Sequence, residues 1–236
     1  MKCDSEVNYT LVRTKDYNLK LKKNVILNMK TFLTSVVCIL CVCMISVGCK
    51  KDNVIQEHDK DGNLIRHYEV DTDSLIHGLY LVFRSNGDTL EQAMYTHGKL
   101  NGKRAIYYPG NQPEQVEYYE MDSLSGSYQV FHKNGQLQFQ GTFIENKFQG
   151  EAKSYYDNGA LKEEVLFVDN EENGPFIEYY QTGGKKWEGE YKNGDNEIGL
   201  LLHFAENGDT IKKMECDDLF ICRTFYRNEK YPEDVE

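Results

Sequence analysis

Apolar and polar residues alternate along short segments of the chain, and turn signals separate these segments at a regular step. Residues 137–143, LQFQGTF, alternate in this way, and residues 186–191, KWEGEY, do the same. Alternation with a period of two is typical of a strand that buries one face, and a helical period fits neither segment. The pattern predicts an all-β chain.

Glycines mark a repeat of about 24 residues. They stand at positions 78, 102, 126, 150, 174 and 199, and nine residues after each comes a turn signal such as Asn134-Gly135. An aromatic ring stands five residues after each glycine: Phe83, Tyr107, Phe131, Tyr155, Tyr179 and Phe204. A second column stands seventeen residues after it: Tyr95, Tyr119, Phe143, Phe167 and Tyr191, with Cys216 in the sixth copy. Each copy is therefore predicted to be a β-hairpin.

The parity of the two aromatic columns selects a turn type. Both columns stand at odd distances from the glycine, and a three-residue loop such as 133–135 pairs odd positions with odd ones. Such a loop is a type I turn followed by a left-handed glycine. We therefore expect both columns on one face, with Phe131 opposite Leu137 and Tyr155 opposite Leu161.

The segment 150–161, GEAKSYYDNGAL, resembles the bacterial MORN-repeat variant found in YwqK-type antitoxins. The resemblance covers about residues 58–216, and it implies tandem hairpins in an elongated, twisted antiparallel meander sheet that serves as an interaction surface. One copy departs from the motif at residues 108–113. Because Pro113 cannot donate a ladder hydrogen bond, we expect its strand to be short or displaced.

The N-terminal part has the form of an export signal. Residues 32–47 are apolar and too short to span a bilayer, and residues 46–49 resemble a lipobox that ends at Cys49, the expected site of lipid attachment. A plain signal peptide or a short anchor is the alternative. The predicted divisions are a possible non-native extension at 1–28, a signal peptide at 29–48, a tether at 49–57, the repeat domain at 58–226 and a C-terminal tail at 227–236. A lipid anchor predicts the cell envelope, at the outer membrane, on either its periplasmic or its outer side.

Charge and cysteines narrow the partners. The formal net charge is −11, and residues 49–236, with 20 basic and 35 acidic groups, carry −15. Such a surface repels phosphate backbones, so nucleic acid is an improbable partner. Cys216 and Cys222 flank a five-residue segment and could form a disulfide or remain two buried thiols; without neighbouring histidines they do not suggest a metal site.

The sequence contains no recognisable catalytic motif. Six histidines stand at different repeat positions, so no shared histidine or metal site is expected, and no cofactor is implied. Acidic residues are numerous, which leaves a carbohydrate-active enzyme as the least favoured reading. We expect a non-enzymatic chain.

Four tyrosines offer the best candidate binding face. Tyr108, Tyr118, Tyr156 and Tyr180 each neighbour a tyrosine of the aromatic columns, so they are expected on the opposite, wetter face. There they could contact a protein or a glycan, or simply cover a thin sheet. The first hypothesis is an envelope lipoprotein that acts as a binding module. The alternative is an antitoxin or an immunity protein that neutralises a toxin.

Overall fold

The computed structural model describes residues 53–231, and these form one antiparallel sheet of 17 strands with no helix. The strands are β1 (Asn53–His58), β2 (Leu64–Val70), β3 (Ile76–Phe83), β4 (Thr89–Thr96), β5 (Lys99–Tyr107), β6 (Pro113–Glu120), β7 (Ser123–Leu124), β8 (Gly126–Phe131), β9 (Leu137–Ile144), β10 (Lys147–Phe148), β11 (Gly150–Tyr155), β12 (Leu161–Val168), β13 (Glu171–Tyr179), β14 (Lys185–Tyr191), β15 (Glu197–Phe204), β16 (Thr210–Cys216) and β17 (Cys222–Arg227). The expected all-β fold of tandem hairpins is confirmed.

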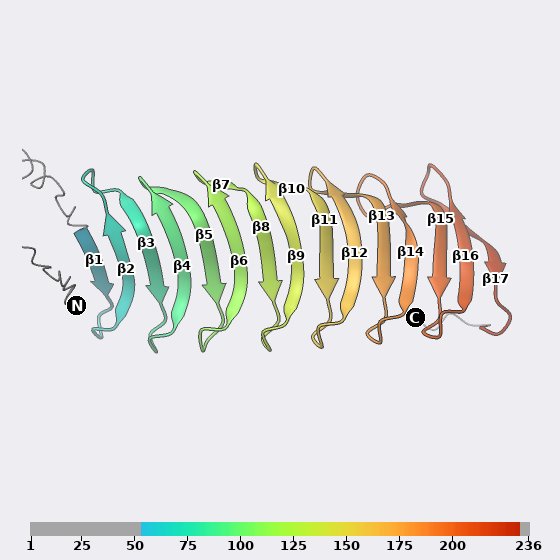
Figure 1. Ribbon diagram of the computed structural model, residues 1–236, viewed down its shortest axis with the longest axis horizontal. Coiled ribbons are helices and arrows are strands. Elements are labelled where there is room, and N and C mark those ends of the chain that lie inside the picture. The colour runs from blue at the N-terminus through green and yellow to red at the C-terminus, as the bar shows by residue number, and fades with distance from the viewer. Residues whose placement is uncertain (1–52, 232–236) are drawn as a thin grey trace, which may run out of the picture. The chain divides into compact units, whose positions relative to one another are not determined.

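The strands lie side by side in chain order, from β1 at one end to β17 at the other (Figure 1). Two of them, β7 and β10, are fragments of two residues. β7 and β8 both pair with β6, and β10 and β11 both pair with β9, so each of these two couples forms one interrupted strand. The sheet is an open meander, since β1 and β17 are its two end strands.

The hairpin turns have the predicted three-residue loop. In the hairpin of β8 and β9, the amide of His132 donates to the Gln136 carbonyl and the amide of Gly135 donates to the His132 carbonyl, both at 2.8 Å. Gly135 has a φ of 88°, the left-handed conformation that such a loop requires. Phe131 pairs with Leu137, as expected.

The expected parity of the aromatic columns is wrong. Phe131 pairs with Leu137, but the preceding Val130 pairs with Phe139, so a β-bulge adds one residue beside the turn. Side chains alternate between the two faces of a sheet. One extra residue therefore moves every following side chain of that strand to the other face. The two aromatic columns therefore lie on opposite faces of the sheet.

The face that carries the second aromatic column is the better buried one, and we call it the aromatic face. Its rings contact one another across strands: Phe143 lies 5.4 Å from Tyr128 and 4.9 Å from Phe148, and Phe148 lies 4.7 Å from Phe167, between ring centroids. The central core cluster comprises Phe148, Ala152, Val165, Phe176, Leu201 and Cys216. Burial of these side chains is the main stabilising contribution on this face.

A polar network interrupts the aromatic face near its N-terminal end. Arg104 pairs with Glu117 across β5 and β6, and its guanidinium donates to both Glu91 and Glu117 at 2.6 Å. Glu117 is 4% exposed and also accepts from the Tyr119 hydroxyl at 2.9 Å. In every other repeat the position of Arg104 is held by an aromatic or aliphatic residue, so this repeat replaces apolar packing by a buried ion pair.

The other face, which we call the opposite face, carries the first aromatic column. Tyr107 donates to Gln92, Tyr155 accepts from Gln140, and Tyr179 donates to Glu164 through its hydroxyl at 2.9 Å. These cross-strand contacts join aromatic rings to polar side chains, and they differ in kind from the ring-to-ring packing of the aromatic face.

The repeat glycines have a backbone reason to be glycine. Gly126 has a φ of 116° and Gly174 a φ of 128°, and strand pairing shifts by two residues close to both. Side chains larger than hydrogen are strained in this region, so the glycine column marks a second bulge in each repeat.

Three boundary expectations need correction. Pro113 pairs with Tyr107 at the first position of an eight-residue strand, which is neither short nor displaced, because a strand's first residue tolerates proline. Residues 53–57, expected in a tether, form most of β1 and pair with β2. In the expected tail, the amide of Asn228 donates to the Ile211 carbonyl at 2.8 Å, so the tail begins as part of the packed structure.

Candidate binding surface

Three of the four predicted tyrosines join successive repeats. Each is half-buried, and its hydroxyl donates to a backbone carbonyl 23 or 24 residues further along the chain. The donations run from Tyr108 to Phe131 at 3.1 Å, from Tyr156 to Tyr179 at 2.7 Å and from Tyr180 to Phe204 at 2.8 Å. Their hydroxyls are committed to inter-repeat bonds and do not form one exposed row.

Arg84 and His132 occupy the same repeat position and make equivalent bonds. The Arg84 guanidinium donates to the Tyr107 carbonyl at 2.6 Å, and His132 Nε2 lies 3.0 Å from the Tyr155 carbonyl oxygen. We call Arg84, Tyr108, His132, Tyr156 and Tyr180 together the inter-repeat ladder. It is a structural feature that the tyrosine doublets alone did not reveal, because its members are chemically different.

Tyr118, the fourth predicted tyrosine, is 40% exposed and lies on the opposite face. It belongs to a line of side chains that crosses the sheet from strand to strand near the bulge glycines. Opposed pairs in this line are Leu79 with Met94, Lys103 with Tyr118, Ser127 with Thr142, Glu151 with Leu166, Pro175 with Glu190, and Leu200 with Glu215. We call these twelve residues the cross-strand row.

In the C-terminal half of the cross-strand row, each opposed pair joins an apolar side chain to an acidic one. Leu200 is 49% exposed, and Glu215 opposite it is also exposed. Glu151 and Glu190 are exposed beside Leu166 and Pro175 in the same way. Apolar groups beside exposed carboxylates are suited to a partner that combines apolar and basic groups.

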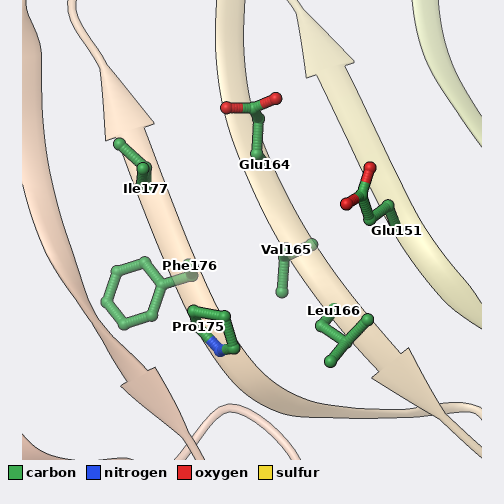
Figure 2. A pocket seen from close by; sticks show the side chains of 7 residues that line it. All are labelled: Glu151, Glu164, Val165, Leu166, Pro175, Phe176 and Ile177. Carbon is green, nitrogen blue, oxygen red and sulfur yellow. The ribbon is translucent and has the colours of Figure 1, made fainter.

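A shallow hollow of about 170 Å³ opens within this half of the row. Its walls come from β11, β12 and β13, and Figure 2 shows the two carboxylates beside the apolar side chains. The lining residues are Glu151, Glu164, Val165, Leu166, Pro175, Phe176 and Ile177. The hollow is mostly apolar with an acidic edge.

The carboxylate of Glu164 is already engaged at the edge of the hollow. It accepts from the Lys153 ammonium and from the Tyr179 hydroxyl. The bond from Lys153 holds the pKa of Glu164 below its ordinary value, and Glu164 in turn raises the pKa of Lys153. Glu164 is therefore ionised at neutral pH, and Glu151 is the more available carboxylate for a basic partner.

A second pair of carboxylates lies on the aromatic face. Glu163 on β12 is directly opposed to Glu178 on β13. Burial, followed by the like charges of Glu178 and Glu172, raises the pKa of Glu163. The same two causes, burial first, raise the pKa of the neighbouring Tyr191. The pair is an electrostatic cost to the sheet at neutral pH.

Cys216 and Cys222 are joined by a disulfide and are opposed across β16 and β17, with 3.9 Å between their Cα atoms. Cys216 is buried in the core cluster, at the position that rings occupy in the preceding repeats. The disulfide therefore joins β16 to β17 at a position where the preceding repeats have an aromatic ring.

Several expectations lie outside the described residues. These are the extension at 1–28, the signal peptide at 29–48 and the lipid-attachment residue Cys49. Within residues 53–231, no helix has the length and apolar character needed to cross a membrane.

The fold and the cross-strand row define an open, single-sheet repeat protein with two solvent-facing sides. Residues 124–145 and 148–169 match the family described as the MORN repeat variant. The chain therefore carries tandem MORN-variant repeats, as the sequence motif suggested. No curated protein matches the chain.

Two solved structures of TarM, one of them named as the S. aureus protein, show a partial likeness. Both are 13% identical to this chain with a TM-score of 0.25, and the matches cover 52% and 51% of this chain. They cover 21% and 20% of the TarM chains, so this chain spans about a fifth of their length.

Proposed function

We propose that this chain is a non-enzymatic, lipid-anchored protein of the cell envelope whose repeat sheet binds a protein partner through the C-terminal half of the cross-strand row. The observation that carries the proposal is that each opposed pair in that half joins an apolar side chain to an exposed acidic one, around the hollow. The partner segment combines apolar side chains with lysine or arginine.

The length of the acidic half sets the size of the partner segment. Glu151 on β11 and Glu215 on β16 are five strands apart in the meander. At about 4.8 Å between neighbouring strands, this corresponds to about 24 Å. About seven extended residues or about sixteen helical residues span that distance. A single amphipathic segment therefore covers the row.

Charge favours the same kind of partner. Residues 49–236 carry a formal charge of −15, with 20 basic and 35 acidic groups, so the surface attracts basic proteins at long range. The apolar residues of the row supply contact area that an acidic surface alone lacks. A partner is recognised specifically when it matches both the negative charge and the apolar residues of the row.

Anchoring is tested separately from binding. The full chain is expressed in a Gram-negative host, and its N-terminal peptide is analysed by mass spectrometry beside a Cys49→Ala variant. A diacylglyceryl-modified Cys49 in membrane fractions, absent from the variant, is the expected result. An uncleaved chain in the soluble fraction would rule out the lipoprotein assignment and strengthen a cytoplasmic antitoxin role.

Binding is tested by site-specific photo-crosslinking of the full chain in envelope extract of its source cells. A crosslinking residue at Leu200 is compared with one at Ile144, which is similarly exposed at 55% but lies outside the row. We expect a discrete adduct from position 200 only. Replacing Glu151, Glu190 and Glu215 with glutamine should weaken it by about tenfold, because each surface charge contributes up to about 1 kcal/mol.

Two outcomes would contradict the binding proposal. One is the same set of adducts from both positions, which would indicate nonspecific contact. The other is an adduct at Leu200 that neither added salt nor the triple glutamine variant weakens, since an acidic row must respond to both. An adduct that contains glycan alone would assign the surface to a different class of ligand.

A further inference from the structure

Three side chains of types that bind metal ions meet where the ends of β2, β3, β4 and β5 lie together, away from the acidic half of the cross-strand row. Asp71 follows β2, His77 lies in β3 and His97 connects β4 to β5, and their ligand atoms all lie within 4.8 Å of one another. Their different repeat positions predicted no shared site, yet the structure brings these two histidines together. Their repeat positions differ, but the connections that hold them come from neighbouring strand ends.

Asp71 is held in place before any ion arrives. Its side chain is 5% exposed, and its Oδ1 accepts from the amides of Asp73 at 2.9 Å and Leu75 at 3.0 Å. Its Oδ2 is directed at His97 Nδ1, 2.6 Å away. The carboxylate therefore has one oxygen fixed by the backbone and one that faces the histidines.

The two histidines are positioned by the backbone around them. Their ring centroids are 5.0 Å apart, and the amide of His97 donates to His77 Nδ1 at 3.4 Å. His97 has a φ of 47°, and the following Gly98 amide donates to the Ile76 carbonyl at 2.7 Å. The turn that carries His97 is thus tied to the strand that carries His77.

The next repeat shows that the fold itself does not require this residue set. The positions of Asp71, His77 and His97 are held there by Thr96, Asn101 and Met121. The Met121 amide donates to Asn101 Oδ1 at 3.3 Å, which reproduces the bond from His97 to His77, and Met121 has a φ of 49°. Asparagine and methionine satisfy the same backbone geometry, so the imidazoles add a capacity that the turn does not need.

We propose that Asp71, His77 and His97 bind a divalent transition-metal ion of the Zn²⁺ type. Two imidazoles and a carboxylate form a common protein ligand set for such ions, and three protein ligands leave a fourth position for water. Tetrahedral bonds of about 2.0 Å place ligand atoms about 3.3 Å apart, so the set must contract by up to about 1.5 Å. The ligand atoms of His97 and Asp71 are only 2.6 Å apart and must separate by about 0.7 Å to admit the ion. His97 is 60% exposed and can turn to make this room, and the ion then replaces the proton between them.

The test uses the full chain without a polyhistidine tag, freed of metal by a chelator and titrated with Zn²⁺ by calorimetry. Co²⁺ serves as a spectroscopic probe, since its visible absorption reports coordination geometry. We expect one equivalent of each ion, competition between them, release by chelator, and no binding of Ca²⁺, because imidazole nitrogen is a poor ligand for a hard cation.

The variants follow from the neighbouring repeats. His77→Asn keeps the acceptor that Asn101 supplies, and His97→Asn is compatible with the left-handed backbone, since Asn193 at the equivalent position has a φ of 57°. Each should weaken Zn²⁺ binding by more than about 100-fold, beyond what loss of an outer partner causes. His58→Asn, on an exposed histidine of β1, should bind like the original chain.

Binding of Zn²⁺ that all three variants leave unchanged would overturn the proposal, and so would the absence of binding up to millimolar Zn²⁺. Far-ultraviolet circular dichroism of each variant confirms that a loss of binding is not a loss of fold. Weak binding reduced equally by His58→Asn and His77→Asn would indicate scattered surface histidines and would equally refute the site.

Discussion

The buried ion pair of the aromatic face makes a strong prediction about stability. Arg104→Leu leaves Glu117, with a side chain 5% exposed, without its charged partner. Removal of one member of a buried pair costs about 3–5 kcal/mol, and we reduce this to about 2–4 kcal/mol because the Arg104 side chain is 25% exposed. Burial opposes the guanidinium charge, yet Glu91 and Glu117 raise the pKa of Arg104, so the guanidinium is charged at all ordinary pH values.

A second substitution should restore most of this loss. Arg104 and Glu117 are directly opposed, and the equivalent opposed pair in the last repeat is Leu201 and Met214. The double variant Arg104→Leu/Glu117→Met therefore places a packing pair that this fold already contains. We expect its stability to lie within about 1 kcal/mol of the original chain, since apolar replacement of a buried ion pair is often neutral.

The assay combines denaturant unfolding with hydrogen exchange. Repeat arrays can unfold region by region, so a global midpoint alone underestimates a local loss. Amides of β5 and β6 should exchange about 30-fold to 1000-fold faster in Arg104→Leu and return close to their original rate in the double variant. Equal destabilisation of the single and double variants, or a single variant within about 0.5 kcal/mol of the original, would refute the reasoning.

Three further predictions concern single positions. Tyr156→Phe removes the hydroxyl bond to the Tyr179 carbonyl and should cost about 0.5–1.5 kcal/mol in chemical denaturation. Because burial and Glu178 raise the folded pKa of Glu163, this group makes the sheet less stable as pH rises from below about 4 through the folded pKa. Glu163→Gln should therefore flatten that slope in pH-dependent unfolding and, with solvent screening, gain a few tenths of a kcal/mol at pH 7. Gly150→Ala meets no atom within 4 Å but keeps a φ of 83°, so a loss of about 1–2 kcal/mol by thermal unfolding would isolate backbone strain.

The periodic part of the fold could be predicted from sequence because its causes are local. Alternation gave the strands, and Asn134-Gly135 gave a three-residue turn whose hydrogen bonds are found as expected. The relation between the two aromatic columns could not be predicted in this way. It depends on a bulge between Val130 and Phe131, and a one-residue bulge leaves no clear trace in the alternation while reversing a whole strand.

The structure separates Tyr118 from the other three predicted tyrosines for a related reason. Counting positions assigned Tyr118 and Tyr156 to one face, but Tyr118 lies within β6, whereas Tyr156 directly follows β11 and begins a hairpin turn. The Tyr156 hydroxyl reaches a carbonyl 23 residues away, and Tyr118 is 40% exposed on the opposite face. The spacing identified the repeated tyrosines. Their role could not be predicted, because it depends on which backbone carbonyl the neighbouring repeat brings within reach of each hydroxyl.

Departures from the repeat are therefore where specific chemistry is concentrated. Positions that hold the sheet together recur in every copy, since each copy must solve the same packing problem against its neighbours. His77 and His97 stand where the next repeat has Asn101 and Met121, which make the equivalent hydrogen bond. In the same way, Glu151 pairs with Leu166 where an earlier repeat pairs Ser127 with Thr142. A feature that the scaffold does not need is explained better by a ligand than by folding. In this chain that reasoning points to the edge that carries the histidines and to the acidic half of the cross-strand row.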